Sequence, residues 1–314
     1  MQTLLNMLLL LGASLVLIKA VDYFVKSVTK LSHALKISSY TVSFLLVAIA
    51  TSLPEAFVGI TAALEQESVL SYGNVLGSNI ALLTLIVALP SLLNSKLKTE
   101  SIFKSKDIYY TILFVLVSLV LSFDGTLGKR DGMLLLVGYA VYTIAFIRRS
   151  SRIEQLLESF ERRNVAKQLL IFFVSLLVIL IASEGIVRGA INLSTLLKLE
   201  IGFIGLTITA IGTSLPEIAF AIASVRNHHE KDVMGDVVGS VVANTTLVLG
   251  ITAVIFPINT SDPDLSVSSN IFLLIALLLF YIFTRSKGNL DKKESVALLA
   301  LYFIFVLFEY YTQF

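Results

Sequence analysis

The chain has 314 residues, of which 56% are hydrophobic and only 15% are charged, and its mean hydropathy of +0.88 is strongly positive. This composition is typical of integral membrane proteins and excludes an ordinary soluble domain. The net charge of +2 carries little information by itself, and the lack of cysteine excludes disulfides and thiolate metal sites. Any bound metal would therefore be held by oxygen or imidazole.

The first apolar run begins directly after Met1-Gln2-Thr3, without the basic segment of a cleaved signal peptide, and continues into Lys19 and Asp22. We therefore expect it to be the first membrane helix. Apolar runs long enough to cross a hydrocarbon core of about 30 Å recur along the whole chain. Ten spans are predicted, at 4–24, 40–65, 71–93, 108–123, 131–147, 167–190, 201–226, 232–257, 268–284 and 295–312.

The basic residues alternate between the two sides of this arrangement. Ten spans place both termini on one side, whose loops hold four Lys or Arg residues, whereas the loops on the opposite side hold nineteen. Because basic loops are retained in the cytoplasm, both termini are predicted to be extracytoplasmic. The protein is expected in the cell (plasma) membrane as a multi-pass protein.

The longest predicted loop is basic and has apolar residues at helical spacing on one face. That pattern is typical of an amphipathic helix lying on a membrane surface. The chain is therefore divided into a first five-helix repeat at 1–147, an amphipathic cytoplasmic linker at 148–166 and a second five-helix repeat at 167–314.

An internal repeat relates the two halves. A shift of 162 residues aligns A-I-A-T-S-L-P-E at 48–55 with A-I-G-T-S-L-P-E at 210–217, and G-N-V-L-G-S at 73–78 with G-D-V-V-G-S at 235–240. Because each half has an odd number of spans, the second half must enter the membrane in the opposite orientation. The sequence thus predicts an all-α membrane protein of about ten helices, built as two inverted five-helix repeats, an architecture common among secondary transporters.

Each repeat places a glutamate inside an apolar span, Glu55 in the first and Glu217 in the second. A carboxylate near the centre of a membrane helix costs about 2.5–3.5 kcal/mol on insertion scales, so it must face a partner or a cavity. Each glutamate follows a proline, which frees a backbone carbonyl of the preceding turn. Each proline follows Thr-Ser-Leu, so the hydroxyls of Thr51, Ser52 and their repeats Thr213 and Ser214 are expected beside the carboxylates.

This oxygen-rich set suits hard cations, because calcium takes six to eight oxygen ligands in flexible geometry. Two carboxylates carry a charge of −2, which one divalent ion, several monovalent ions or two protons can balance. The Gly-x-x-x-Gly-Ser motifs let helices approach closely and bring Ser78 and Ser240 to the packed surface. The same helix faces carry Asn74 in the first half and Asp236 and Asn244 in the second.

These motifs resemble the repeats of the sodium/calcium exchanger branch of the calcium:cation antiporters, and the chain is most similar to the short prokaryotic members. The resemblance covers nearly the whole sequence and implies a secondary-active antiporter, with calcium and sodium as transported ions and the lipid bilayer as its surroundings. It implies no enzyme activity, no cofactor, no nucleic acid and no protein partner. By this resemblance, calcium is held by Glu55, Glu217, Thr51 and Thr213, and sodium sites are completed by Ser52, Ser214, Ser78, Ser240 and the carbonyls of Ala48 and Ala210.

The chain departs from the family pattern at three positions. Family members commonly have Asn and Asp one turn beyond the two serines, where this chain has Leu82 and Asn244. In addition, Asp236 stands where the usual motif has Asn. A negative charge is therefore expected to have moved two turns along one helix face, with consequences for ion preference.

Three other functions remain open at this point. A calcium or other divalent cation/proton antiporter would use the same site, with both glutamates releasing calcium by taking protons. A cation channel could also select ions with carboxylates and hydroxyls, but two acids related by an inverted repeat form no oligomeric ring. An intramembrane enzyme is disfavoured because the spans contain no nucleophile and base pair and no set of transition-metal ligands.

Overall fold

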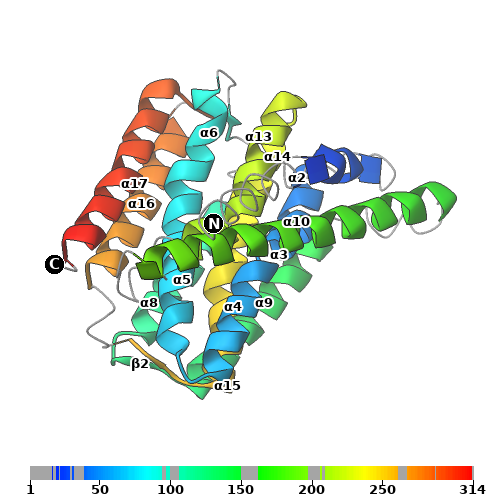
Figure 1. The fold of residues 1–314 in the computed structure, drawn as a ribbon. Helices are drawn as coiled ribbons and strands as arrows, with labels where there is room; N and C mark the ends of the chain where they lie inside the picture. Colours follow the sequence, from blue (N-terminus) through cyan, green and yellow to red (C-terminus); the bar gives the residue numbers. More distant parts are fainter. Residues whose placement is uncertain are drawn as a thin grey trace.

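The computed structural model of the protein is almost entirely helical (Figure 1). It describes residues 16, 19–20, 22–28, 30–31, 39–93, 97–99, 106–149, 162–196, 206, 209–260, 267–286 and 288–312. In these segments, seven helices are long and apolar enough to cross a membrane, and Asp107–Leu121 is a shorter apolar helix. The protein is thus an all-α, multi-pass membrane protein.

The first half contains two long helices that change their winding along their length. One runs from Tyr40 to Leu64 and the next from Ser68 to Leu92. They are divided into α2 (Ser39–Val42), the π-helical turn η1 (Ser43–Val47), α3 (Ala48–Thr51) and α4 (Leu53–Leu64), then α5 (Ser68–Ala81), the π-helical turn η2 (Leu82–Ile86) and α6 (Val87–Leu92). Helices α8 (Asp107–Leu121) and α9 (Lys129–Arg149) follow.

The second half repeats this pattern. Its elements are α10 (Arg162–Leu196), α12 (Ala210–Thr213), α13 (Leu215–Arg226), α14 (Glu230–Val242), the π-helical turn η5 (Ala243–Val248), α15 (Leu249–Ile255), α16 (Val267–Ser286) and α17 (Lys292–Thr312). Helices α4 and α13 begin 162 residues apart, as do α5 and α14, and α6 and α15. The backbone therefore follows the repeat that the sequence predicts, π-helical turns included.

Two short antiparallel strand pairs join the halves at loop positions. Strand β1 (Leu97–Lys98) pairs with β4 (Asn289–Leu290), and β2 (Thr126–Leu127) pairs with β3 (Ile258–Asn259). Each pair links a segment from the first half to one from the second. The two halves are consequently tied together outside the helices as well as within them.

The buried side chains form two separate apolar clusters. The larger cluster unites residues of α5, η2, α8, α14 and η5 with α16 and α17, so it spans both halves. The smaller cluster joins the segment 20–31 to α10 and to one face of α3 and α13, with Phe24, Phe172 and Phe220 among its members. The segment 20–31 and α10 thus form a layer of their own against the main bundle.

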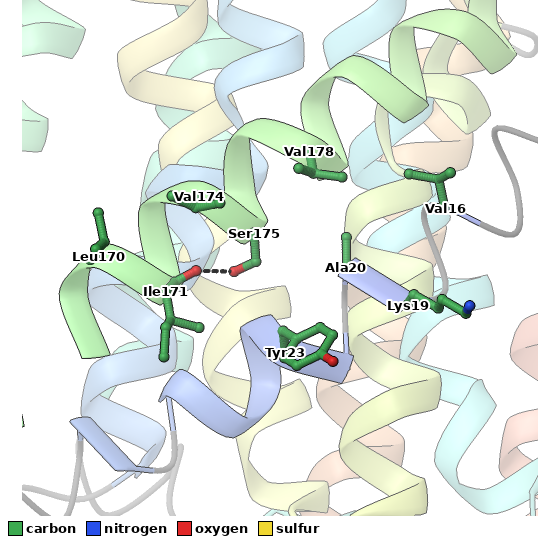
Figure 2. Close-up of a pocket in the computed structure, with 9 residues that line it drawn as sticks. All are labelled: Val16, Lys19, Ala20, Tyr23, Leu170, Ile171, Val174, Ser175 and Val178. Atoms are coloured by element: carbon green, nitrogen blue, oxygen red, sulfur yellow. Dashed lines mark hydrogen bonds between the residues drawn. The ribbon is translucent and has the colours of Figure 1, made fainter. Parts of the chain in front are cut away.

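Helix α10 runs across the other helices at a steep angle in Figure 1. Only 28% of the apolar stretch Val165–Ala182 of α10 is buried, compared with 83% of an apolar stretch of the same length within the helix Ser68–Leu92. Between α10 and the N-terminal segment lies an apolar pocket of about 520 Å³, lined by Tyr23, Val174 and neighbouring residues (Figure 2). The pocket contains no carboxylate, so it is unlike the oxygen-rich site expected from the sequence.

The predicted spans agree with the helices where the structure describes them, with end points that differ by a few residues. The third and eighth spans begin earlier than predicted, at Ser68 and Glu230, because polar first turns precede the apolar runs. The predicted linker 148–166 and the start of the first span lie largely outside the described residues.

Candidate cation site

Two helix breaks position the predicted glutamates. Helix α3 ends at Thr51 and α12 ends at Thr213. The residues that follow, Ser52 and Ser214, have backbone angles φ and ψ of −77° and 0° and of −84° and 6°, respectively. A Leu-Pro pair begins the next helix in each case, because proline lacks an N–H that the first turn would leave unpaired anyway. Glu55 and Glu217 then fall in the first turn of α4 and α13, where the helix dipole favours negative charge.

Two glycines allow the helices of opposite halves to cross at these breaks. A Cβ atom on Gly239 would lie 2.6 Å from Cβ of Ala48 and 2.7 Å from the carbonyl oxygen of Phe44. A Cβ atom on Gly77 would lie 2.7 Å from Cβ of Ala210 and would overlap the carbonyl of Leu206. Only glycine permits such approaches, which follow the same 162-residue repeat.

The Glu55 carboxylate is fully buried and is bonded to both halves. Its Oε1 accepts a hydrogen bond from Ser78 Oγ at 3.2 Å and a longer one from Ser214 Oγ at 3.5 Å. Within the described residues its Oε2 has no hydrogen-bond partner. One oxygen is therefore held in position while the other remains available to a ligand.

The hydroxyl of Thr213 lies at the centre of this part of the site. It donates to Asn74 Oδ1 at 3.2 Å or to the carbonyl of Ala210 at 3.3 Å, and it lies 3.4 Å from Ser78 Oγ. Ser78 Oγ is also 3.4 Å from the Ala210 carbonyl oxygen. The break in α12 thus places a carbonyl and a hydroxyl of the second half beside Glu55 of the first half.

The mirror arrangement surrounds Thr51. Its hydroxyl lies 3.2 Å from Asp236 Oδ1, 3.3 Å from the Ala48 carbonyl oxygen and 3.5 Å from Ser240 Oγ. The pair Thr51 and Asp236 repeats the pair Thr213 and Asn74 with the same 3.2 Å distance. The repeat is therefore preserved in geometry while the acceptor changes from an amide to a carboxylate.

Glu217 differs from Glu55 although both are fully buried. Neither of its oxygens has a hydrogen-bond partner among the described residues, and the same holds for the Ser52 hydroxyl. The Thr51 hydroxyl and the Asp236 carboxylate lie close enough to the Glu217 carboxylate to interact with it electrostatically. By contrast, the buried Asp107 accepts hydrogen bonds from Tyr40 and Tyr142 at 3.0 Å each. Because buried polar groups normally have hydrogen-bond partners, the unpartnered oxygens of Glu217 point to a ligand such as a cation.

Asn244 lies one turn beyond Ser240, in η5. Its amide nitrogen donates to Oδ1 of Asn79 at 3.3 Å, which links the second half to α5 of the first. The repeat position of Asn244 is Leu82, which is fully buried in the larger apolar cluster. This end of the site is therefore polar on one side and apolar on the other.

The donor atoms around the two breaks are all oxygens from carboxylates, hydroxyls, carbonyls and amides. In the part of the chain that the structure describes, no three His, Asp or Glu side chains gather closely enough to hold a metal by themselves. A cation here would therefore need mixed oxygen ligands, which suits calcium and sodium better than transition metals.

All twelve predicted site residues are described and buried. Hydrogen bonds connect most of them, whereas Glu217 and Ser52 lie beside the network with free oxygens, and Asn244 is bonded to Asn79. The sequence prediction left Asn74 out of the ligand set and missed Asn79. Asn74 could have been found from its position one turn before Ser78, but Asn79 has a valine as its repeat and gave no signal.

Comparison with known proteins decides the family. The sodium/calcium exchanger protein family matches residues 5–148 and 167–311, which is most of the chain. The chain belongs to this family. One relative, the sodium/calcium exchanger MaX1 of Methanosarcina acetivorans, is 28% identical over 98% of this chain and 99% of its own length. The inner membrane protein YrbG of Escherichia coli is 27% identical over 97% of this chain and 96% of its own.

A solved structure of the sodium-calcium exchanger NCX_Mj agrees with the whole fold. It has a TM-score of 0.84 and 25% identity, and the match covers 97% of this chain and 98% of that one. These findings confirm the predicted fold class of an all-α exchanger with inverted repeats. The full-length agreement with prokaryotic relatives also confirms the predicted short type.

Proposed function

We propose that this protein exchanges sodium for calcium across a membrane by alternating access, with Glu55 and Glu217 as the charged ligands of one central site. The observation that carries the proposal is the pair of fully buried carboxylates with free oxygens at two symmetric helix breaks. Such groups are costly in a membrane unless cations bind them. Membership of a family of antiporters supports the same function.

Within this site we assign two overlapping sets of ligands. Calcium would be held by the carboxylates and by the threonine hydroxyls at the ends of the broken helices. Sodium would use the flanking hydroxyls and the carbonyls of Ala48 and Ala210, which also accept the backbone N–H groups of Ser52 and Ser214. The calcium ligands are Glu55, Glu217, Thr51 and Thr213, and the sodium positions add Ser52, Ser214, Ser78, Ser240, the Ala48 and Ala210 carbonyls, Asp236 and Asn244. The oxygen chemistry and the burial of these residues support this assignment.

The test is radioactive calcium uptake into proteoliposomes that contain the purified protein. We expect uptake when an outward sodium gradient is imposed, because sodium leaving the site makes its carboxylates available to calcium. Uptake driven by an outward proton gradient without sodium would instead identify a calcium/proton antiporter. Calcium flux that continues without either counter-ion would contradict exchange and favour a channel.

For alternating access we propose that the layer of segment 20–31 and α10 moves against the main bundle. The close packing of Phe24 on Phe172 supports treating segment 20–31 and α10 as one unit, and the smaller apolar cluster is where this unit meets α3 and α13. The rings of Phe24 and Phe172 lie 4.7 Å apart within the layer, whereas those of Phe24 and Phe220 lie 6.1 Å apart between the layer and α13.

The chain has no cysteine, so a single introduced pair can be cross-linked without background. Joining Phe24→Cys to Phe220→Cys with a short bismaleimide should stop exchange, because it fixes the layer to the bundle. The matched pair Phe24→Cys and Phe172→Cys lies within the layer, so cross-linking it should leave most exchange. Equal activity in both cross-linked proteins would contradict this motion.

We also propose that both termini are extracytoplasmic and that the 148–166 linker is cytoplasmic. The excess of basic residues on one set of loops supports this orientation. A single cysteine at position 2 should react with an impermeant maleimide in intact cells, and one at position 155 should react only after permeabilisation. The opposite labelling pattern would reverse the topology.

A further inference from the structure

The second half presents a charged helix face that the first half lacks. Four polar residues spaced four apart lie on one face of α14 and η5, and all are fully buried; they are Asp232, Asp236, Ser240 and Asn244. The repeat positions in the first half are Leu70, Asn74, Ser78 and Leu82. This helix face therefore carries two carboxylates in the second half and none in the first, although the backbones repeat.

Of these carboxylates, Asp236 lies within hydrogen-bond distance of a site residue, Thr51. Thr51 Oγ1 lies 3.2 Å from its Oδ1, and Ser240 Oγ lies 3.5 Å from the same hydroxyl. The second oxygen, Oδ2, has no hydrogen-bond partner in the described segments, and neither do the two oxygens of the neighbouring Glu217. These three buried oxygens all belong to the second-half side of the site.

The hydrogen bond alone does not explain the charge of Asp236. In the first half, Asn74 accepts the equivalent bond from Thr213 at the same 3.2 Å distance without any charge. An uncompensated carboxylate within a membrane span is energetically costly, and an asparagine would avoid that cost. A positive ion is therefore needed to balance the carboxylate, and the surrounding donors are oxygens only.

We propose that Asp236, with Thr51, Ser240 and Glu217, forms a charged sodium position whose counterpart in the first half has the neutral Asn74 in place of Asp236. The inference rests on the proposed function and specifies its ion coupling. Calcium balances the charges of Glu55 and Glu217, whereas the third carboxylate allows one more sodium ion to bind when calcium is absent. The exchange ratio then includes one sodium ion that depends on Asp236.

The decisive variant is Asp236→Asn, because Asn74 shows that an amide fits this hydrogen-bond geometry. The coupling ratio is measured as the reversal potential of calcium flux in proteoliposomes with fixed sodium and calcium gradients. We expect the variant to exchange one sodium ion fewer per calcium than the wild type. We also expect its half-activating sodium concentration to rise about tenfold, since a ligand carboxylate is lost.

The matched control is Asp232→Asn, the same substitution one turn away on the same buried helix face. It should leave the coupling ratio of the wild type unchanged. An unchanged ratio in Asp236→Asn, or an equal decrease in Asp232→Asn, would overturn the local sodium position while leaving exchange itself established. A ratio that changes with proton gradient and not with sodium would identify a proton as the third charge and overturn the proposal. Absence of sodium-driven calcium flux in the wild type would contradict the proposed function itself, not the sodium position alone.

Discussion

The surroundings of Glu55 and Glu217 differ although their sequences repeat. Glu55 receives hydrogen bonds from Ser78 of its own half and Ser214 of the other. Glu217 receives none within the described residues, and it lies near Asp236. The repeated backbone thus gives each half the same scaffold, while a few side chains give the two carboxylates different partners. Symmetry of fold does not imply symmetry of ion binding.

The common scaffold follows from the close helix crossings. Gly77 and Gly239 hold α5 and α14 against the segments before the breaks, with Ala210 and Ala48 as their contacts. Any larger side chain at these glycines would move the serine that follows them. The differences that bear on ion binding are those among the residues that project into the site, so substitutions there test the comparison directly.

The largest effect is expected from Glu55→Gln and Glu217→Gln. Each variant removes one of the two calcium-binding charges, and one charge pair at about 4 Å is worth about 4 kcal/mol at an effective dielectric constant of 20, or roughly a thousandfold in affinity. Sodium-driven calcium uptake should therefore fall to background in both. Gel filtration and thermal stability should remain close to wild type, because Gln can still accept from Ser78 at position 55 and breaks no hydrogen bond at 217.

An exposed carboxylate provides the control for these variants. Glu65 lies at the exposed end of α4, so Glu65→Gln should transport at the wild-type rate. Near-normal uptake in Glu55→Gln or Glu217→Gln would remove that residue from the site. Loss in only one of them would show that the asymmetry extends to calcium binding itself.

A smaller and unequal effect is expected from Thr51→Val and Thr213→Val. The first leaves a buried carboxylate oxygen of Asp236 without its donor, and the second leaves an amide oxygen of Asn74 without its donor. Unsatisfied buried groups cost about 1–3 kcal/mol, and more when they are charged. Thr51→Val should therefore raise the half-saturating calcium concentration more than Thr213→Val, which flux measurements over a range of calcium concentrations would show. Equal shifts would mean that the charge of Asp236 has no influence on this hydroxyl.

The sequence predicted the scaffold well because its signals are local and repeated. Apolar runs set the helices, and a matched Pro, Thr, Ser and Glu at a 162-residue shift set the breaks at Ser52 and Ser214. The two Gly-x-x-x-Gly-Ser motifs predicted close helix packing, and the structure confirms it at Gly77 and Gly239.

The parts that the sequence did not predict depend on contacts between the halves. The π-helical turns η2 and η5 have no composition signal in common, because η2 is mostly apolar whereas η5 contains Asn244, Thr245 and Thr246. The pairing of Asn79 with Asn244 joins positions that the repeat does not relate. Likewise, the sequence could not show that Glu55 accepts hydrogen bonds from two serines while Glu217 accepts none among the described residues, because the same motif surrounds both glutamates.

The smallest effect is expected from Asn244→Asp, which restores the carboxylate common in the family at this position. Asn244 bonds to Asn79 through its amide nitrogen, and the amide nitrogen of Asn79 has no partner among the described residues. Rotation of the Asn79 amide lets it donate to the new carboxylate, so the polar contact is kept. Burial favours the neutral acid form of the new carboxyl group, so the variant exchanges one hydrogen bond for another, which is worth about 1 kcal/mol, or roughly fivefold in calcium affinity.

Radioactive calcium uptake over a range of calcium concentrations would measure this shift, with sodium-driven exchange retained. The companion variant Leu82→Asn supplies an uncharged polar group on the first-half side and is the control for polarity alone. Since Leu82 is fully buried in the apolar cluster, its replacement should lower thermal stability more than it alters exchange. If Asn244→Asp abolished exchange, the second half could not accept a carboxylate beside Asp236, and the charge at Asp236 would then be a replacement for the one absent at 244.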